Sequence, residues 1–193
     1  MEESDWSSDV CSSDLAEHGT GPRTREIRMQ MARDGWLCFG WPKEYGGRGR
    51  DEVDHFLFFD ETMRAMAPIP MMTVNTVGPT LMRFGTEAQK RDYLPRIASG
   101  ELVFCIGYSE PNAGTDLAAL SMRAVRDGDH WIVNGQKTWT SYARGADYCW
   151  LAVRTDPTAA KHAGISILIV DMRSPGIRVD PLELLGEHDI NQV

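Results

Sequence analysis

The first half of the chain carries apolar residues at helical spacing. Ile27 and Met31 lie four residues apart before Gly35, and Asp51 is placed to cap a following helix. We expect that helix to turn its apolar residues toward a core, namely Val53, Phe56, Leu57, Met63 and Met66. Thr86 and Gln89 have the spacing of a capping box at the start of another helix, which Gly100 ends. The pattern therefore predicts an all-helical region at 23–100.

Beyond Glu101 the apolar pattern changes to the two-residue period of a β-strand. Strands are predicted at 102–108, 121–126, 130–133, 137–141, 147–154, 165–170 and 177–179. Asp127-Gly128 and Asn134-Gly135 favour hairpins, because both central residues of a type I′ turn have positive φ. Too few helices intervene for a parallel doubly wound sheet. We therefore expect an α+β protein in which the helical domain is followed by an antiparallel β-barrel or sandwich at 101–193.

Residues 1–22 differ from both of these regions in composition. Ser7-Ser8-Asp9 is repeated as Ser12-Ser13-Asp14, and the run is small, polar and acidic. The stretch SSDVCSSDL also resembles translated sequencing-adapter DNA. We expect a disordered or foreign segment here, with a native acidic tail as the alternative.

Charge and composition argue against several classes of protein. The net charge of −8 disfavours a nucleic-acid partner. The longest strongly apolar run, 165–170, is far shorter than the roughly 20 residues that span a bilayer, so no membrane association is expected. Four cysteines without C-x-x-C spacing predict neither a metal site nor a disulfide framework; they are Cys11, Cys38, Cys105 and Cys149. An acidic start without a signal peptide favours a cytoplasmic location.

Two segments carry candidate chemistry. Residues 107–116 leave a strand and contain small residues that let a ligand approach the backbone, although a simple strand-to-turn connection has the same composition. The G-x-G-x-x-G and Walker spacings are absent. The second segment is Trp139-Thr140-Ser141, and taken alone a tryptophan in such a strand most often serves cross-strand packing.

Together, these two segments make residues 23–193 resemble the acyl-CoA dehydrogenase family. Four further motifs support the resemblance: Trp41-Pro42…Tyr45-Gly46-Gly47, Gly85-Thr86…Gln89-Lys90…Tyr93-Leu94-Pro95, Asn134-Gly135-Gln136-Lys137 and Gly164-Ile165-Ser166. The resemblance implies an FAD-containing oxidoreductase of fatty acid or lipid metabolism that forms an α,β double bond in an acyl-CoA thioester. In that reaction a carboxylate removes the Cα proton while hydride leaves Cβ for flavin N5.

The resemblance also implies which residues contact FAD: Ile106, Gly107, Tyr108, Ser109, Gly114, Thr115, Trp139, Thr140 and Ser141. Tyr108 and Ser109 would face the pyrimidine side of the flavin, Trp139 would cover the ring, and Ser141 would lie near N5. Thr115 would also contact the acyl-CoA substrate. Glu110 is interpreted as a structural part of the turn and Asp116 as a loop-stabilising acceptor, so neither is the expected base. Tyr108 replaces a more usual aliphatic residue, as in bacterial relatives that act on bulky acyl-CoA substrates.

No catalytic residue is assigned, because the family's base lies on a C-terminal helical domain and is expected beyond Val193. We therefore expect an inactive fragment of a longer enzyme. The implied partners are acyl-CoA, an electron-transfer flavoprotein or similar acceptor, and other subunits of a homo- or hetero-oligomer. Two alternatives remain: a non-catalytic FAD- or acyl-CoA-binding subunit of a heteromeric dehydrogenase, and a flavin oxidase of the same fold.

Overall fold

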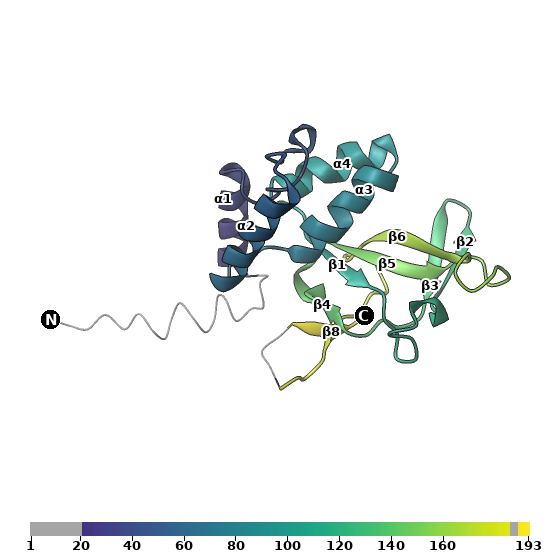
Figure 1. Ribbon diagram of the computed structural model, residues 1–193. Coiled ribbons are helices and arrows are strands. Elements are labelled where there is room, and N and C mark those ends of the chain that lie inside the picture. Colours follow the sequence, from purple (N-terminus) through teal and green to yellow (C-terminus); the bar gives the residue numbers. More distant parts are fainter. Residues whose placement is uncertain (1–20, 186–188) are drawn as a thin grey trace. The chain divides into compact units, whose positions relative to one another are not determined.

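The computed structural model describes residues 21–185 and 189–193 (Figure 1). The chain divides into two compact units, Met1–Val103 and Phe104–Val193. Of the segment expected to be disordered or foreign, residues 1–20 lie outside the described residues. No described helix is both long enough and apolar enough to cross a lipid bilayer.

The first unit is helical, and its elements are α1 (Pro22–Arg33), η1 (Lys43–Tyr45), α2 (Glu52–Arg64), the π-helical η2 (Thr73–Val77), α3 (Gly78–Phe84) and α4 (Glu87–Ala98). Local signals set several helix ends. The Asp51 side chain accepts a hydrogen bond from the Asp54 N–H at 2.9 Å, and Thr86 and Gln89 form both bonds of a capping box. Gly35 and Gly100 follow α1 and α4 with positive φ, a conformation that glycine adopts without a steric penalty.

The helix α2 turns a different face inward from the one that the sequence predicts. Phe59 is buried, and Phe58 stacks on Phe39 at a centroid distance of 4.8 Å. The residues expected in the core are exposed instead: Val53, Phe56, Leu57, Met63 and Met66. The prediction was wrong because α2 carries apolar residues on two faces, and the helical period does not say which face has a partner.

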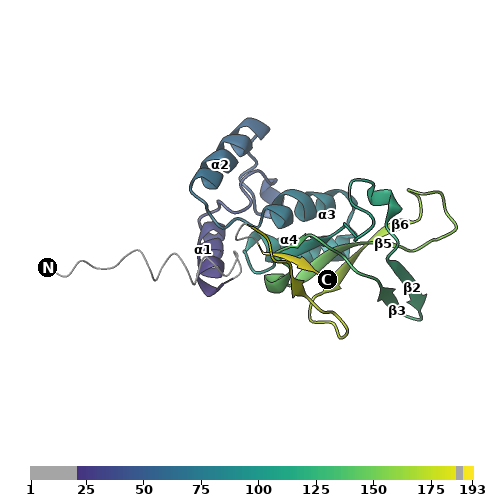
Figure 2. The ribbon, with the colours of Figure 1, turned by 90° about the horizontal axis from the view of Figure 1, so that it is seen from below.

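The second unit contains two sheets (Figures 1 and 2). The larger consists of β1 (Phe104–Gly107), β2 (Arg123–Asp127), β3 (His130–Asn134), β5 (Tyr148–Arg154) and β6 (Ile165–Asp171), and the smaller of β4 (Thr140–Ser141), β7 (Asp180–Pro181) and β8 (Ile190–Gln192). In the larger sheet β5 pairs in antiparallel fashion with β6, which runs beside it in Figure 2, and in parallel with β1.

The α+β class is confirmed, but the sheet is mixed rather than antiparallel, and the described strands form two open sheets rather than a closed barrel. The reason lies in the connections. Hairpin signals govern only strands that are neighbours in sequence, as in the β2–β3 hairpin around Gly128, where φ is +58°. The long connection from β1 to β5 leaves the direction of their pairing free.

Asn134-Gly135 does not form the expected hairpin. The strand before it, β3, pairs with β2, whereas β4 pairs with β8. Gly135 instead lies against Met122, since an added Cβ would come within 2.8 Å of Met122 Cγ. Close packing therefore accounts for this glycine better than a type I′ turn does.

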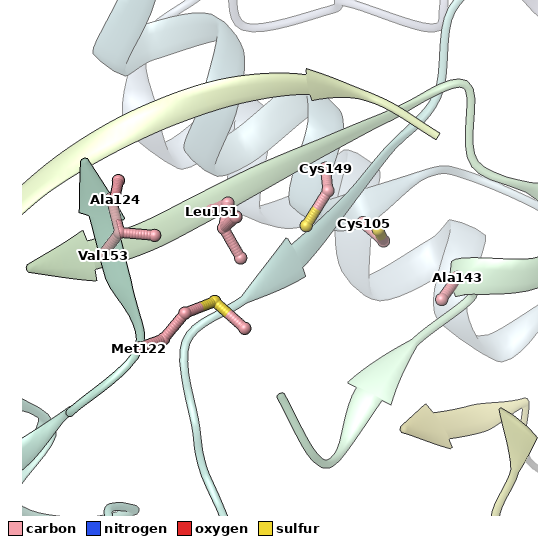
Figure 3. Close-up of a cluster of buried hydrophobic side chains, with 7 residues drawn as sticks. All are labelled: Cys105, Met122, Ala124, Ala143, Cys149, Leu151 and Val153. Carbon is pink, nitrogen blue, oxygen red and sulfur yellow. The ribbon is translucent and has the colours of Figure 1, made fainter. Parts of the chain in front are cut away.

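The second unit contains a cluster of buried apolar side chains, which Figure 3 shows. It is formed by Cys105, Met122, Ala124, Ala143, Cys149, Leu151 and Val153. The three described cysteines, Cys38, Cys105 and Cys149, are free and buried, and Cys11 lies outside the described residues. This cluster supports β1 and β5 directly before the loop that leaves β1.

Candidate functional site

The loop after β1 begins at a closely packed glycine. An added Cβ at Gly107 would lie 2.8 Å from Leu151 Cδ1 and 3.0 Å from Cys149 Sγ, so a larger residue would require these side chains to shift. Farther along, the loop closes on itself: the Glu110 N–H donates to the Ala113 carbonyl at 2.8 Å, and the Ala113 N–H donates to the Glu110 carbonyl at 3.0 Å. Tyr108 and Ser109 are therefore held between a packed strand end and a tight turn.

The Glu110 carboxylate holds this turn in place and is fully occupied. It accepts hydrogen bonds from Ser121 N–H (2.7 Å), Ser121 Oγ (2.8 Å), Met122 N–H (2.8 Å) and Lys137 Nζ (2.9 Å). Burial pushes the pKa of Glu110 upward, but these hydrogen bonds outweigh it and hold the pKa below its usual value. A carboxylate that is ionised and used in this way is a structural anchor, in agreement with the sequence interpretation.

The segment that contains the tryptophan lies beside this loop. The Thr138 N–H donates to the Ser109 carbonyl at 2.9 Å, and Lys137 Nζ donates to the Tyr108 carbonyl at 2.9 Å. Two stretches about thirty residues apart in the sequence are thus joined at consecutive residues. The structure therefore brings together Tyr108 and Ser109 with the residues that directly precede Trp139.

Trp139 and Tyr142 have unusual backbone conformations. Their φ angles are +59° and +60°, a left-handed region that residues other than glycine rarely adopt. Trp139 is 60% exposed and Tyr142 is 44% exposed, so neither side chain is buried as compensation. Strain of this kind costs on the order of 1–3 kcal/mol and is concentrated at functional sites. The exposed indole of Trp139 lies beside the loop after β1 and offers a surface on which a flat ligand can stack.

The remaining predicted site residues differ in their surroundings. Ile106 and Ser141 are half-buried, whereas Gly114 and Thr115 are exposed on the outer part of the loop. Within the described residues, no hydrogen bond or ion pair joins Gly114 or Thr115 to the tryptophan segment. Asp116 accepts a hydrogen bond from Lys161, as expected of a loop acceptor. Thr140 is fully buried, with its carbonyl bonded by Asn191 Nδ2 at 3.2 Å, so its side chain faces away from the Trp139 surface.

Sequence reasoning missed two residues of this site. Tyr142 carries no signal that distinguishes it from a surface tyrosine, because its positive φ follows from the chain path. Lys137 was recognised only as part of a motif, and its complete burial was unexpected, since lysine is rarely found buried without a partner.

Among the described residues, no group of three or more His, Cys, Asp or Glu side chains is arranged to hold a metal ion.

Two family models match the chain. The acyl-CoA dehydrogenase N-terminal domain matches residues 9–101, and the acyl-CoA dehydrogenase middle domain matches residues 105–192. A curated relative, the acyl-CoA dehydrogenase FadE26 of Mycobacterium tuberculosis, is 54% identical over 184 residues, which are 94% of this chain and 46% of the relative. The chain thus spans about half the length of the curated relatives it matches.

Solved structures agree with these matches. The Tcur3481-Tcur3483 steroid ACAD is 52% identical with a TM-score of 0.88, over 93% of this chain and 47% of that one. The ChsE4-ChsE5 complex of Mycobacterium tuberculosis contains a chain 56% identical with a TM-score of 0.83, over 87% and 44%. A glutaryl-CoA dehydrogenase of Mycobacterium smegmatis in complex with FADH2 is 26% identical with a TM-score of 0.71, over 87% and 43%. The family matches in both units, together with these relatives, show that the chain belongs to the acyl-CoA dehydrogenase family.

Proposed function

We propose that this chain forms the N-terminal and middle parts of an FAD-dependent acyl-CoA dehydrogenase that introduces an α,β double bond into an acyl-CoA thioester. The observation that carries the proposal is the left-handed, exposed Trp139, which the Thr138–Ser109 hydrogen bond holds next to the loop after β1. The structure of the glutaryl-CoA dehydrogenase relative in complex with FADH2 supports the choice of cofactor.

The residues present fit a flavin ring. Trp139 offers a flat, exposed surface, and the half-buried Ser109 offers its hydroxyl nearby. Gly114 leaves open space, because an added Cβ there would have no neighbour within 4 Å. Donors facing the pyrimidine side stabilise negative charge on a reduced flavin, the usual way in which a protein adjusts its potential. When bound, FAD supplies the acceptor for the hydride that leaves Cβ.

The other predicted site residues take supporting roles in this proposal. Ile106, Gly107 and Tyr108 would hold the flavin through their backbone, and Ser141 would contribute from the segment that contains Trp139. Thr140 contributes through its backbone, since its side chain is buried. Thr115, exposed at the end of the loop, contacts the acyl-CoA thioester chain. The base that removes the Cα proton is expected beyond Val193.

The substrate and the partners are part of the same proposal. The name of the steroid relative favours a bulky acyl group. The Tyr108 side chain packs against Ala113, Leu120 and Ala152, so we assign it to packing rather than to substrate contact. The ChsE4-ChsE5 complex favours a hetero-oligomer. The electron acceptor in this proposal is an electron-transfer flavoprotein or a similar protein.

The test uses the full-length protein that contains this chain. The purified protein should show flavin absorbance that a suitable acyl-CoA bleaches, whereas the 193-residue chain should give no turnover with an artificial electron acceptor. Trp139→Ala should weaken flavin binding roughly tenfold, because stacking of aromatic rings contributes about 0.5–1.5 kcal/mol beyond burial. Trp131→Ala is the matched control, because Trp131 is 44% exposed on β3 of the same unit. Equal flavin affinity of the two variants, or turnover by the 193-residue chain, would contradict the proposal.

The second candidate function is a non-catalytic subunit of a heteromeric dehydrogenase, which the ChsE4-ChsE5 complex of a relative favours. In that case the full-length protein would bind flavin only after its partner is added, and its C-terminal half would lack a carboxylate in the position of the base. Flavin content measured with and without the partner chain separates the two candidates.

A further inference from the structure

Lys137 is a buried charged residue that the proposed chemistry does not use. Its side chain is 0% exposed, and its Nζ donates to the Tyr108 carbonyl and to Glu110 Oε1, both at 2.9 Å. Removing an ammonium group from water costs several kcal/mol, and apolar replacements of buried ion pairs are often equally stable. Stability alone therefore does not account for a lysine at this position.

The contacts of Lys137 fix the orientation of one particular peptide group. In a trans peptide the C=O and the following N–H point in opposite directions. Since the Tyr108 carbonyl points at Lys137 Nζ, the Ser109 N–H points away from Lys137. The neighbouring groups are already used: the Ser109 carbonyl accepts from Thr138 N–H, and the Glu110 N–H donates to Ala113. The Ser109 N–H is thus the donor that this arrangement turns outward, beside the Ser109 hydroxyl.

The charge of Lys137 is compensated where it lies. The Glu110 carboxylate accepts the ammonium hydrogen bond together with three others from Ser121 and Met122. An ammonium and a carboxylate in direct contact largely cancel each other's field at a distance, so the pair acts on its surroundings mainly through geometry. The same pair also joins the segment before Trp139 to the loop after β1.

We propose that Lys137 is a positioning residue, which aims the Ser109 N–H and hydroxyl at the pyrimidine side of the flavin by holding the Tyr108 carbonyl in the opposite direction. This inference rests on the proposed function, because it requires a flavin at the site. It assigns the orienting role to a side chain that itself has no access to the cofactor.

Lys137→Met in the full-length protein tests the inference, with Ser121→Ala as the matched control. The methionine keeps the apolar stem but leaves the Tyr108 carbonyl without its donor. The serine variant removes one hydrogen bond from the same carboxylate and leaves the Lys137–Tyr108 contact in place. We expect Lys137→Met to lower flavin affinity on the order of tenfold, the effect of one misplaced hydrogen bond, and to make the flavin potential more negative. Ser121→Ala should leave both values unchanged.

A second variant and a cofactor-free measurement guard against simple misfolding. The double variant Glu110→Gln with Lys137→Met removes both charges, so it should regain stability while keeping the altered flavin potential. In the apoprotein, amide hydrogen exchange of the 107–116 loop should be faster in Lys137→Met than in Ser121→Ala.

Three outcomes would overturn the inference. If Lys137→Met kept the flavin affinity and potential of the wild type, the inference would fall while the proposed function stood. The same would follow if Ser121→Ala changed flavin affinity and potential as much as Lys137→Met does. A wild-type full-length protein that binds no flavin would overturn the proposed function, and the inference with it.

Discussion

The two ends of segment 137–141 contact polar clusters that differ in how many of their buried atoms have a hydrogen-bond partner. At one end is the ion-pair network of Lys137, Glu110 and Ser121, in which the carboxylate accepts four hydrogen bonds. At the other end is the β4–β8 cluster, which consists of Thr140, Arg144, Asp189 and Asn191. Three buried atoms of this cluster have no partner among the described residues: Thr140 Oγ1, Asp189 Oδ2 and Asn191 Oδ1.

The difference shows how tightly the backbone is held at each end of segment 137–141. A buried pair in which each charged group has hydrogen-bond partners holds its neighbours in one arrangement, because any movement leaves a charge unpaired. A buried cluster with unmade hydrogen bonds fixes its neighbours less tightly. The loop side of Trp139 is therefore the more rigidly specified side.

The largest effect is expected from Glu110→Ala, which leaves the Lys137 ammonium buried and unpaired. The free energy of unfolding should fall by about 3–5 kcal/mol, as measured by urea titration with far-ultraviolet circular dichroism. Glu101→Ala is the control, because Glu101 pairs with Arg96 at 2.8 Å while 45% of its side chain is exposed. That variant should lose less than about 1 kcal/mol. Similar losses in both variants would show that burial of the ion-pair network carries no special weight.

Asp189→Asn should have an intermediate effect. Its carboxylate accepts from Arg144 Nε at 3.0 Å, but the Arg144 side chain is 44% exposed and stays hydrated after the change. We expect a loss of about 1–2 kcal/mol in the free energy of unfolding, that of a hydrogen bond to a charged group with an accessible partner. A loss as large as that of Glu110→Ala would mean that the β4–β8 cluster is as complete as the ion-pair network.

The smallest effect is expected from Thr140→Val. The Thr140 hydroxyl is buried without a partner among the described residues, so its removal should be neutral or raise the free energy of unfolding by up to about 1 kcal/mol. The comparison is Ser121→Ala, whose hydroxyl donates to Glu110 at 2.8 Å and whose removal should cost about 1 kcal/mol. If Thr140→Val proved the more destabilising of the two, the hydroxyl would have an unrecognised partner, such as a buried water.

Sequence signals predicted those features that depend on few neighbouring residues. The Asp51 cap, the Thr86–Gln89 capping box and a hairpin at Asp127-Gly128 formed, because each is completed within about four residues. The turn of the hairpin differs by one residue from the expected one: Asp127 pairs with His130, and of the turn residues Gly128 and Asp129 only Gly128 has positive φ. The buried face of α2 and the role of Asn134-Gly135 were wrong because they depend on distant partners, Phe39 for α2 and Met122 for Gly135.

For the candidate site, the sequence alone determined the residue types and their order. A loop with small residues follows a strand, and some thirty residues later a tryptophan lies between two threonines. Only the tertiary structure decided that Lys137 is buried against Glu110, that Thr140 faces inward, and that Trp139 adopts a left-handed conformation with its ring exposed. The physical reason is that burial and backbone strain belong to a site's whole surroundings. A lysine becomes a buried anchor only where the fold brings a carboxylate and a carbonyl to within hydrogen-bonding distance of it.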